Sequence, residues 1–217
     1  MAPRLYIGNK AYSSWSLRPW LAMTHFGLPF EDEVIPLDQP TTHTDILRHS
    51  PTGTVPALAV DEIVIWESLA ILEYCADRHS EVAIWPKDAN ARAIARSVSS
   101  EMHAGFGNLR KACPMNMRRA VRKIEVSDAV VADVARIEAL WAATRHDYGQ
   151  GGPFLFGAFT AADAMYAPVV NRLHVYDLVQ QPGSRAYMDA MMALPAWQAW
   201  LEGAKAEPWF LDKYEAI

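Results

Sequence analysis

The spacing of apolar residues changes along this chain, and that change constrains the fold more than any other feature. Up to about residue 80, short apolar runs of strand length alternate with segments of helical spacing. From residue 88 onward the apolar residues keep helical spacing. The sequence therefore predicts an α/β unit followed by an all-helical unit.

The first part contains four short strand-like runs and three helical segments, in the order β-α-β-α-β-β-α. The predicted strands span residues 4–8, 31–37, 57–60 and 63–66. The predicted helices span residues 14–27, 44–50 and 67–79. Only Asp61 and Glu62 separate the last two strands, which is hairpin spacing.

Capping residues mark the predicted helices of the second part. Asp88 begins a helix that runs to about residue 112, before Pro114, and Ser127 begins one that ends at Tyr148. The sequence Thr160-Ala161-Ala162-Asp163 has capping-box spacing and opens a helix to about residue 176. Two shorter helices are expected over 184–193 and 196–204.

These patterns predict two domains. The α/β domain covers residues 1–81, and the helical domain covers residues 88–217. Residues 82–87, which include Pro86, form the linker between them.

Composition excludes several classes of function. The chain has 217 residues and a net charge of -5, so we expect no nucleic-acid partner. Cys75 and Cys113 form no CxxC pair, and the seven histidines show neither HxxxH nor HExxH spacing, so no metal site is expected. Nucleotide-binding glycine loops and the GxSxG elbow are also missing. With no signal-peptide core and no long apolar run, we expect a cytoplasmic protein without membrane contact.

Three serines lie where the first strand gives way to the first helix, in the stretch AYSSWSLRPW. Ser13, Ser14 and Ser16 place three hydroxyl groups within four residues. A helix start needs one capping hydroxyl, which accounts for one of the three. The others are available to face a ligand.

Two further motifs each have a structural and a functional interpretation. Pro56 is acceptable at the start of a strand, or the Val55-Pro56 bond is cis and turns the Val55 backbone toward an extended peptide. Glu67 and Ser68 suit a helix start. They also suit a ligand with an amino acid's paired charges, because Glu67 can hold an ammonium group while Ser68 and the helix N–H groups hold a carboxylate.

Taken together, these motifs resemble the glutathione S-transferase superfamily. The segments SSWSLR, SPTGTVPAL and WESLAILEYCADRH look like its glutathione-binding half, and the TAAD box is similar to one in its helical domain. The SSxSxR pattern resembles the zeta and theta classes, and SVSSEMHAGFGNLRKACPMN resembles a bacterial branch. The likeness covers essentially the whole chain.

The resemblance implies a thioredoxin-like domain that binds glutathione and a helical domain that supplies a second-substrate pocket. On this sequence Ser13 matches the hydroxyl that hydrogen-bonds the glutathione sulfur, with Ser14 as the second choice. Val55, next to Pro56, would pair with the cysteinyl backbone. Glu67 and Ser68 would hold the γ-glutamyl end. The resemblance also implies a homodimer.

The chain departs from the family pattern at two positions. Trp15 replaces a cysteine of the zeta class, which counts against maleylacetoacetate isomerase activity. Thr54 stands where the superfamily often has a long polar residue, so another group is expected to hold the glycine carboxylate. The candidates, among which the sequence makes no choice, are Gln39, Arg48 and His49.

For the second-substrate pocket we expect both apolar and polar residues. The candidates are Trp15, Met102, Phe106, Asn108, Leu109, Arg110, Met115 and Tyr166. The competing interpretation is that the methionines and aromatic residues, at helical spacing, are core. Arg18 is either a residue of a buried ion pair or part of the sulfur site, and the structural role is favoured.

The expected function is a glutathione S-transferase that conjugates the thiol to small apolar electrophiles. A glutathione-dependent isomerase or peroxidase is the first alternative. A non-catalytic binding or scaffold protein is the second, and the joint presence of Ser13, Glu67 and Ser68 argues against it.

Overall fold

The computed structural model describes residues 2–217 and contains one mixed four-stranded sheet. The strands are β1 (Arg4–Ile7), β2 (Glu31–Val34), β3 (Ala57–Val60) and β4 (Ile63–Trp66), in the spatial order β2-β1-β3-β4. β1 pairs parallel with β2 and antiparallel with β3, and β3 pairs antiparallel with β4. The predicted strands and the hairpin are confirmed.

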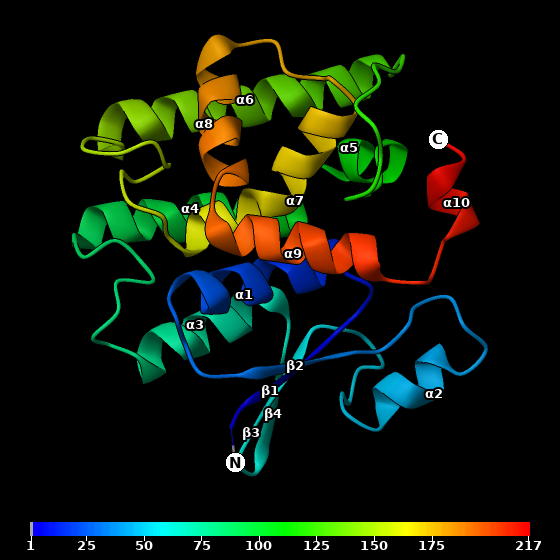
Figure 1. Cartoon of the computed structure of the whole chain (residues 1–217). Coiled ribbons are helices and arrows are strands. Elements are labelled where there is room, and N and C mark those ends of the chain that lie inside the picture. Colours follow the sequence, from blue (N-terminus) through cyan, green and yellow to red (C-terminus); the bar gives the residue numbers. More distant parts are fainter. Residues whose placement is uncertain (1) are drawn as a thin grey trace.

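Three helices accompany the sheet, as predicted. They are α1 (Ser14–His25), α2 (Thr42–Leu47) and α3 (Ser68–Arg78). Residues of β1 alternate between its two faces, because Leu5 and Ile7 join the main core with α1 and α3. Tyr6 packs with Ile35 and with Ile46 of α2 in a separate small cluster. Helices therefore contact both faces of the sheet, the arrangement of a thioredoxin-like domain (Figure 1).

The remainder of the chain is helical. Its helices are α4 (Ala89–Ala104), α5 (Gly107–Ala112), α6 (Asp128–Tyr148), α7 (Ala161–Val175), α8 (Pro182–Met192), α9 (Pro195–Ala206) and α10 (Asp212–Glu215). The central helix α7 is buried along almost its whole length. The fold class is thus α/β plus all-helical, as predicted. Residues 79–88 contain neither helix nor strand, and the domain boundary at 82–87 stays a prediction.

The prediction of one helix from Asp88 to about residue 112 is wrong, because the helix breaks after Ala104. Gly105 is extended, and Phe106 adopts a left-handed backbone with φ of 58°. The α4 hydrogen-bond ladder therefore ends where the Gly105 N–H donates to the Glu101 carbonyl. The short helix α5 then starts in a new direction and helps to line the cleft described below.

Side-chain capping differs among the predicted helix starts. Asp88 accepts a hydrogen bond of 2.8 Å from the Ala91 N–H, and Asp163 accepts from the Thr160 N–H at 2.8 Å, so both predictions are confirmed. Asp163 also accepts from the Leu155 N–H and the Tyr187 hydroxyl. Ser127 occupies its expected position but makes no side-chain cap hydrogen bond.

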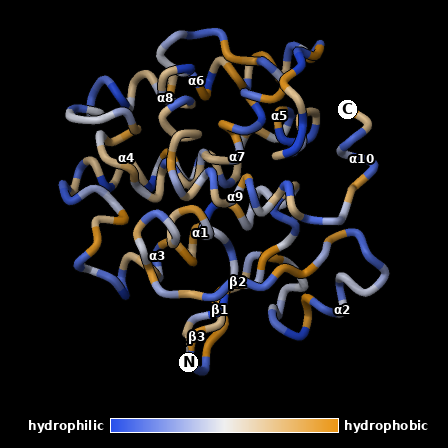
Figure 2. Tube along the Cα trace, viewed as in Figure 1, coloured by the Kyte–Doolittle hydropathy of each residue, from blue (hydrophilic) through white to orange (hydrophobic). Residues whose placement is uncertain are grey.

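Helix α1 belongs to both parts of the molecule. It packs against α3 on the sheet side and against α7 and α9 on the helical side (Figure 1). Trp20 of α1 meets Trp200 of α9 with ring centroids 5.1 Å apart, and both side chains are in the same continuous core. The hydropathy trace shows orange and blue residues alternating along the helices of this region, as expected for helices with one face in a core (Figure 2).

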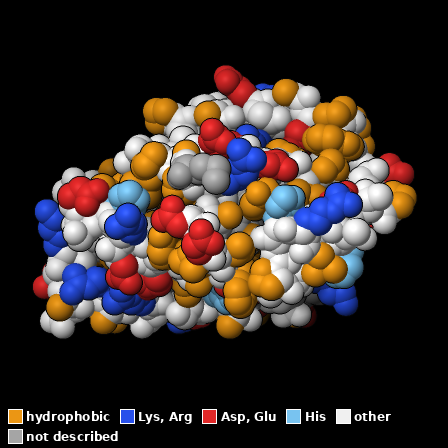
Figure 3. Space-filling model, turned by 90° about the horizontal axis from the view of Figure 1, so that it is seen from below, with side chains coloured by type: hydrophobic (Ala, Val, Ile, Leu, Met, Phe, Trp, Pro, Cys, Tyr) orange, Lys and Arg blue, Asp and Glu red, His pale blue; other side chains and the backbone are white. Residues whose placement is uncertain are grey.

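The outer surface carries charges of both signs. On the face seen from below, acidic and basic side chains are interspersed with apolar ones (Figure 3). Within residues 2–217, no helix combines the length and the apolar character needed to cross a membrane.

Candidate functional site

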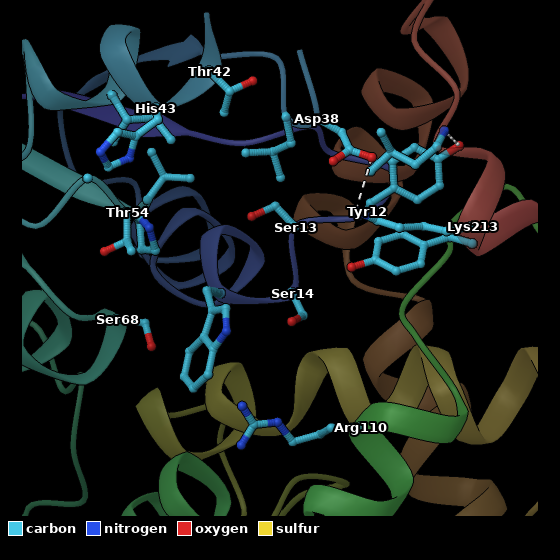
Figure 4. A pocket seen from close by; sticks show the side chains of 18 of the residues that line it. Tyr12, Ser13, Ser14, Asp38, Thr42, His43, Thr54, Ser68, Arg110 and Lys213 are labelled. Atoms are coloured by element: carbon cyan, nitrogen blue, oxygen red, sulfur yellow. Dashed lines mark hydrogen bonds and ion pairs between the residues drawn. The ribbon is translucent and has the colours of Figure 1, made fainter. Parts of the chain in front are cut away.

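A cleft of about 1240 Å³ lies between the sheet domain and the helices. On the sheet side, its walls are the β1–α1 loop, the segment from Leu37 to Ile46, residues 53–56 and the start of α3. On the helical side, they are the region around α5, one residue of α7 and the C-terminal segment. Figure 4 shows Ser13 and Ser14 in the middle, with Thr42, His43 and Thr54 on one side and Tyr12 and Lys213 on the other. Arg110 faces the two serines from the helical domain (Figure 4).

The three serines have different surroundings. Ser13 and Ser14 line the cleft, whereas Ser16 is fully buried. The Ser13 hydroxyl donates to Ser16 Oγ at 2.8 Å, and Ser16 Oγ also accepts from the Gly8 N–H at 3.0 Å. Among residues 2–217, no hydrogen-bond partner is found for the Ser14 hydroxyl.

The expectation that one of these hydroxyls caps α1 is wrong. Ser13 holds the position before the helix, but its side chain makes no cap hydrogen bond. The reason is that its hydroxyl is turned toward Ser16, which ties the end of β1 to α1 through Gly8.

The Val55-Pro56 bond is cis, as the functional interpretation predicted. Both residues line the cleft together with Thr54. Thr54 Oγ1 lies 2.7 Å from Thr52 Oγ1, so this position presents a short hydroxyl to the cleft and no long polar side chain.

Glu67 and Ser68 line the cleft at the start of α3. Glu67 has a left-handed backbone with φ of 69° and makes no side-chain cap hydrogen bond. Left-handed non-glycine residues are costly and cluster at functional sites. Glu67 Oε2 lies 3.5 Å from Nε2 of His103, and burial lowers the pKa of that histidine, which disfavours its charged form.

The three residues predicted as candidates to bind the glycine carboxylate differ in their position relative to the cleft. Gln39 lines the cleft. His49 is not among the lining residues, because its ring stacks on Tyr6 with centroids 4.0 Å apart. Arg48 is exposed and pairs with Asp45 at 2.9 Å. His43, which the sequence reasoning missed, lies in the cleft wall beside Gly53.

The residues predicted for the second-substrate pocket also differ in position, since some line the cleft and others do not. Trp15 and Arg110 line the cleft. The apolar candidates belong to the helical core and not to the cleft wall, which corrects the prediction for Met102, Phe106, Leu109, Met115 and Tyr166. Helical spacing turns these side chains toward neighbouring helices, and Tyr166 donates its hydroxyl hydrogen bond to the Val98 carbonyl at 3.1 Å. Asn108 is exposed outside the cleft wall.

Two guanidinium groups lie close to the Trp15 ring. Arg18 is 4.2 Å and Arg110 4.8 Å from the centroid of its ring system, both within cation–π range. Arg18 is fully buried, and no carboxylate of residues 2–217 lies within ion-pair distance of it, so the predicted ion pair is wrong. Burial and the nearby Arg172 and Arg110 lower the pKa of Arg18 to about 9, which leaves it protonated at pH 7.

Family models match both halves of the chain. A glutathione S-transferase N-terminal domain model matches residues 12–78, and a C-terminal domain model of the same superfamily matches residues 116–203. The chain belongs to the glutathione S-transferase superfamily.

Curated relatives of this superfamily member span most of its length. Protein IN2-1 of Zea mays is 29% identical over 96% of this chain and 82% of its own. Glutathione S-transferase Z2 of Arabidopsis thaliana is 26% identical, covering 87% of this chain and 88% of its own. Maleylacetoacetate isomerase of Rattus norvegicus is 26% identical, covering 90% of each chain.

Solved structures of the superfamily have the same fold. A glutathione transferase homologue from Burkholderia, crystallised with bound glutathione, aligns with a TM-score of 0.68 at 23% identity over 94% of this chain and 99% of its own. A homologue from Drosophila mojavensis, also with bound glutathione, aligns with a TM-score of 0.71 at 21% identity over 97% of this chain and all of its own.

The C-terminal segment of this superfamily member reaches back to the cleft, which sequence reasoning missed. Leu211, Lys213 and Tyr214 line the cleft, and Lys213 pairs with Asp38 at 3.0 Å (Figure 4). Arg172 of α7 also lines it and was not predicted. The available signal was an Asn171-Arg172 pair inside an otherwise apolar helical run.

Proposed function

We propose that this chain binds glutathione in the cleft, ionises its thiol and conjugates it to small electrophiles. One observation carries the proposal: the cleft brings together Ser13, Ser14, Val55, Glu67 and Ser68, which lie on three separate segments. Each of these segments matches a different part of a γ-glutamyl tripeptide in charge and hydrogen-bonding capacity.

The proposed binding mode follows the order of these residues. Glu67 holds the γ-glutamyl ammonium group, and Ser68 with the first N–H groups of α3 holds the carboxylate beside it. The Val55 backbone pairs with the cysteinyl residue, which directs the sulfur to Ser13, with Ser14 as the alternative donor. Gln39 and His43 remain for the glycine carboxylate.

Thiol ionisation by itself contributes little to the rate. An ordinary cysteine thiol has a pKa of about 8.5, so only about 3% is thiolate at pH 7. Lowering the pKa by about two units raises the thiolate fraction roughly 25-fold, but lower basicity reduces nucleophilicity roughly 6- to 10-fold. The net gain is about 2.5- to 4-fold. Orientation of sulfur and electrophile, worth several kcal/mol, must supply most of the rate.

A glutathione-dependent isomerase is the second candidate. Maleylacetoacetate isomerases are among the relatives, and the cationic side chains of the cleft suit an acidic substrate. Against it, Trp15 stands where the zeta class has cysteine. A peroxidase would use the same serines, and a non-catalytic binding protein would keep glutathione affinity without turnover.

We further propose a cytoplasmic homodimer. Ile63 and Trp66 are exposed on β4, one of the two edge strands of the sheet, and exposed apolar side chains on a sheet edge favour association.

The test begins with ligand binding. Millimolar glutathione is expected to raise the melting temperature, because a ligand that binds only the folded state stabilises it. Conjugation is then measured with 1-chloro-2,4-dinitrobenzene, beside hydroperoxide and maleyl-type substrates. Absence of both thermal stabilisation and retention on immobilised glutathione would remove the ligand assignment.

Serine variants locate the sulfur site. Ser13→Ala is expected to lower the conjugation rate about 2.5- to 4-fold, the net gain from ionisation, since the variant loses the hydrogen bond that favours the thiolate. Ser97→Ala is the matched control, because Ser97 is exposed on α4 and its hydroxyl bonds only the Ala93 carbonyl. If Ser13→Ala is as active as the control and Ser14→Ala is not, the role moves to Ser14.

A further inference from the structure

The helical wall of the cleft is strongly cationic. Arg110 and Lys111 of α5 and Arg172 of α7 all line it. Arg18 lies behind Trp15 and adds a fourth positive charge close to the same wall. Arg110, Lys111 and Arg172 come from segments that the proposed glutathione-binding mode does not use, whereas Arg18 donates to Ser68 Oγ at 3.5 Å.

Arg172 is the most informative of them, because it is buried and incompletely bonded. Its side chain is 4% exposed, and its Nε–H donates to the Cys113 carbonyl at 2.8 Å. Within the described chain, Nη1 of the same guanidinium has no hydrogen-bond partner. Leaving a buried charged donor unpaired is costly, and because Arg172 lines the cleft, its guanidinium has hydrogen-bonding capacity left for a ligand acceptor.

These arginines form no ion pair with a protein carboxylate. Across residues 2–217, no ion pair within 4.0 Å involves Arg18, Arg110 or Arg172. Of the two acidic residues of the cleft wall, Asp38 pairs with Lys213, and Glu67 lies 3.5 Å from His103 and favours the charged form of Arg18 from beyond ion-pair distance. Arg110 bonds only carbonyl oxygens, those of His103 and Gly105.

Mutual repulsion of the three arginines supports this interpretation. Burial together with the neighbouring arginines lowers the pKa of Arg18 to about 9 and that of Arg172 to about 10. Both groups are still protonated at pH 7. The folded protein therefore holds positive charge at a cost that a bound anion would relieve.

We infer that the electrophilic acceptor of this protein carries a carboxylate, which Arg172 and Arg110 bind on the helical wall of the cleft. A guanidinium fork suits a planar carboxylate better than an ammonium group does. The unsaturated part of the acceptor then lies near Trp15 and faces Ser13 and Ser14. This inference rests on the proposed glutathione conjugation, and it replaces the expectation of a purely apolar acceptor.

A matched pair of electrophiles tests the inference: 4-chloro-3,5-dinitrobenzoate and its methyl ester. In both reactions the thiol proton passes to solvent, sulfur bonds to the ring carbon, and chloride leaves with the bonding electrons. Each kcat/KM is divided by the uncatalysed rate constant of the same compound. We expect this enhancement to be at least 10-fold larger for the carboxylate. An equal or larger enhancement for the ester would overturn the inference.

Variants then assign the effect to the arginines. Arg110→Gln and Arg172→Lys are expected to reduce the carboxylate-to-ester ratio at least fivefold, whereas Arg78→Gln, on an exposed residue outside the cleft, should leave that ratio at the wild-type value. An unchanged ratio in a folded Arg110→Gln or Arg172→Lys protein would contradict the assignment. If Arg172→Lys does not fold, the half-buried Arg110 still provides the test.

The same experiments distinguish this inference from the proposed function. If glutathione neither binds nor reacts with either compound, the proposed function fails. If glutathione binds and the ester reacts as well as the carboxylate, only the acceptor assignment fails. Thermal stabilisation by unreactive 3,5-dinitrobenzoate, compared with 3,5-dinitrobenzamide, measures carboxylate recognition without turnover, and equal shifts would count against it.

Discussion

Ser16 is the residue on which the geometry of the sulfur site depends. Its hydroxyl oxygen accepts hydrogen bonds from the Gly8 N–H and the Ser13 hydroxyl, and it is out of contact with solvent. When Ser13 turns its proton toward a thiolate, Ser16 is free to donate to Ser13 Oγ while it still accepts from Gly8. We therefore regard Ser16 as a positioning residue for Ser13.

This role predicts a pH-dependent defect in Ser16→Ala. Without its partner, Ser13 is less well oriented, and the pKa of bound glutathione should rise by about 0.5–1 unit, since charge-assisted hydrogen bonds favour the ionised form. The thiolate fraction of bound glutathione, followed by its ultraviolet absorbance, should fall about 2- to 6-fold at pH 6.5 and hardly at all at pH 9. A loss of equal size at all pH values would indicate a merely structural role. Ser97→Ala again serves as the control.

Histidine burial predicts a second pH effect, this time on stability. Burial lowers the pKa of His174, and that of His103, below the ordinary value of about 6.5. As the pH falls through 6.5 toward these lower folded-state values, the unfolded chain binds protons first, so stability present above that window is lost. His174→Gln should show a smaller decrease of unfolding free energy between pH 7.5 and 5.5 in urea titrations. An equally steep decrease in the variant would refute this.

At the residue scale, the sequence predicted which residue types take part in the site better than it predicted where each side chain points. Ser13, Glu67 and Ser68 were singled out because three motifs with hydroxyl or acidic groups follow one another in the order of the superfamily, although such groups also serve as helix caps. Met102 and Tyr166 were assigned to a pocket, although both are core residues. Periodicity shows which residues share a helix face, but which neighbour covers that face depends on tertiary packing.

The C-terminal segment is the element whose position was least predictable. Helix α10 has only four residues, and no periodicity shows that it returns to the first domain. Tyr12 holds it there. The Tyr12 hydroxyl accepts from Nη2 of Arg118 at 2.6 Å and from the Leu211 N–H at 3.3 Å, and it donates to Glu215.

Tyr12→Phe should therefore release this segment. The substitution leaves the buried Leu211 N–H and one Arg118 donor without their acceptor, at a cost of about 1–3 kcal/mol. We expect faster amide hydrogen exchange over residues 209–217, with unchanged exchange in α7. Lys213→Ala is the comparison, because it breaks an exposed ion pair worth about 0–1 kcal/mol. If amide exchange over residues 209–217 is as slow in Tyr12→Phe as in wild type, the hydroxyl does not anchor this segment.

Helix starts were predictable and helix interruptions were not. Asp88 and the Thr160–Asp163 box mark starts through hydrogen bonds between residues close in sequence. The break at Gly105–Phe106 has glycines on either side of Phe106, but glycine in a helical pattern does not by itself decide where the chain turns. The left-handed backbone of Phe106 depends on the tertiary contacts that its buried side chain makes.

At the scale of the whole molecule, the two parts share one core through α1. Because α1 packs on α3, α7 and α9, neither part can lose α1 without exposing apolar surface. The sequence predicted both parts and their order but not this shared helix, since side-chain spacing within α1 does not show how many neighbours it has.

The shared core predicts a single unfolding transition. Near- and far-ultraviolet circular dichroism should give coincident urea curves, as for two-state unfolding. Trp20→Ala, which removes the contact with Trp200 between the parts, should lower the unfolding free energy by about 3–5 kcal/mol. Two separate transitions in the wild-type chain would show that the parts unfold independently.

The break between α4 and α5 has an evolutionary consequence. Helix α5 is six residues long, is bounded by a turn on one side and Cys113 on the other, and carries two of the cations of the helical wall. Sequence change in α5 can alter which acceptor fits while Ser13 and Ser14, at the start of α1, are left untouched. Descendants of such a chain can change their partner molecules and keep the same thiol donor.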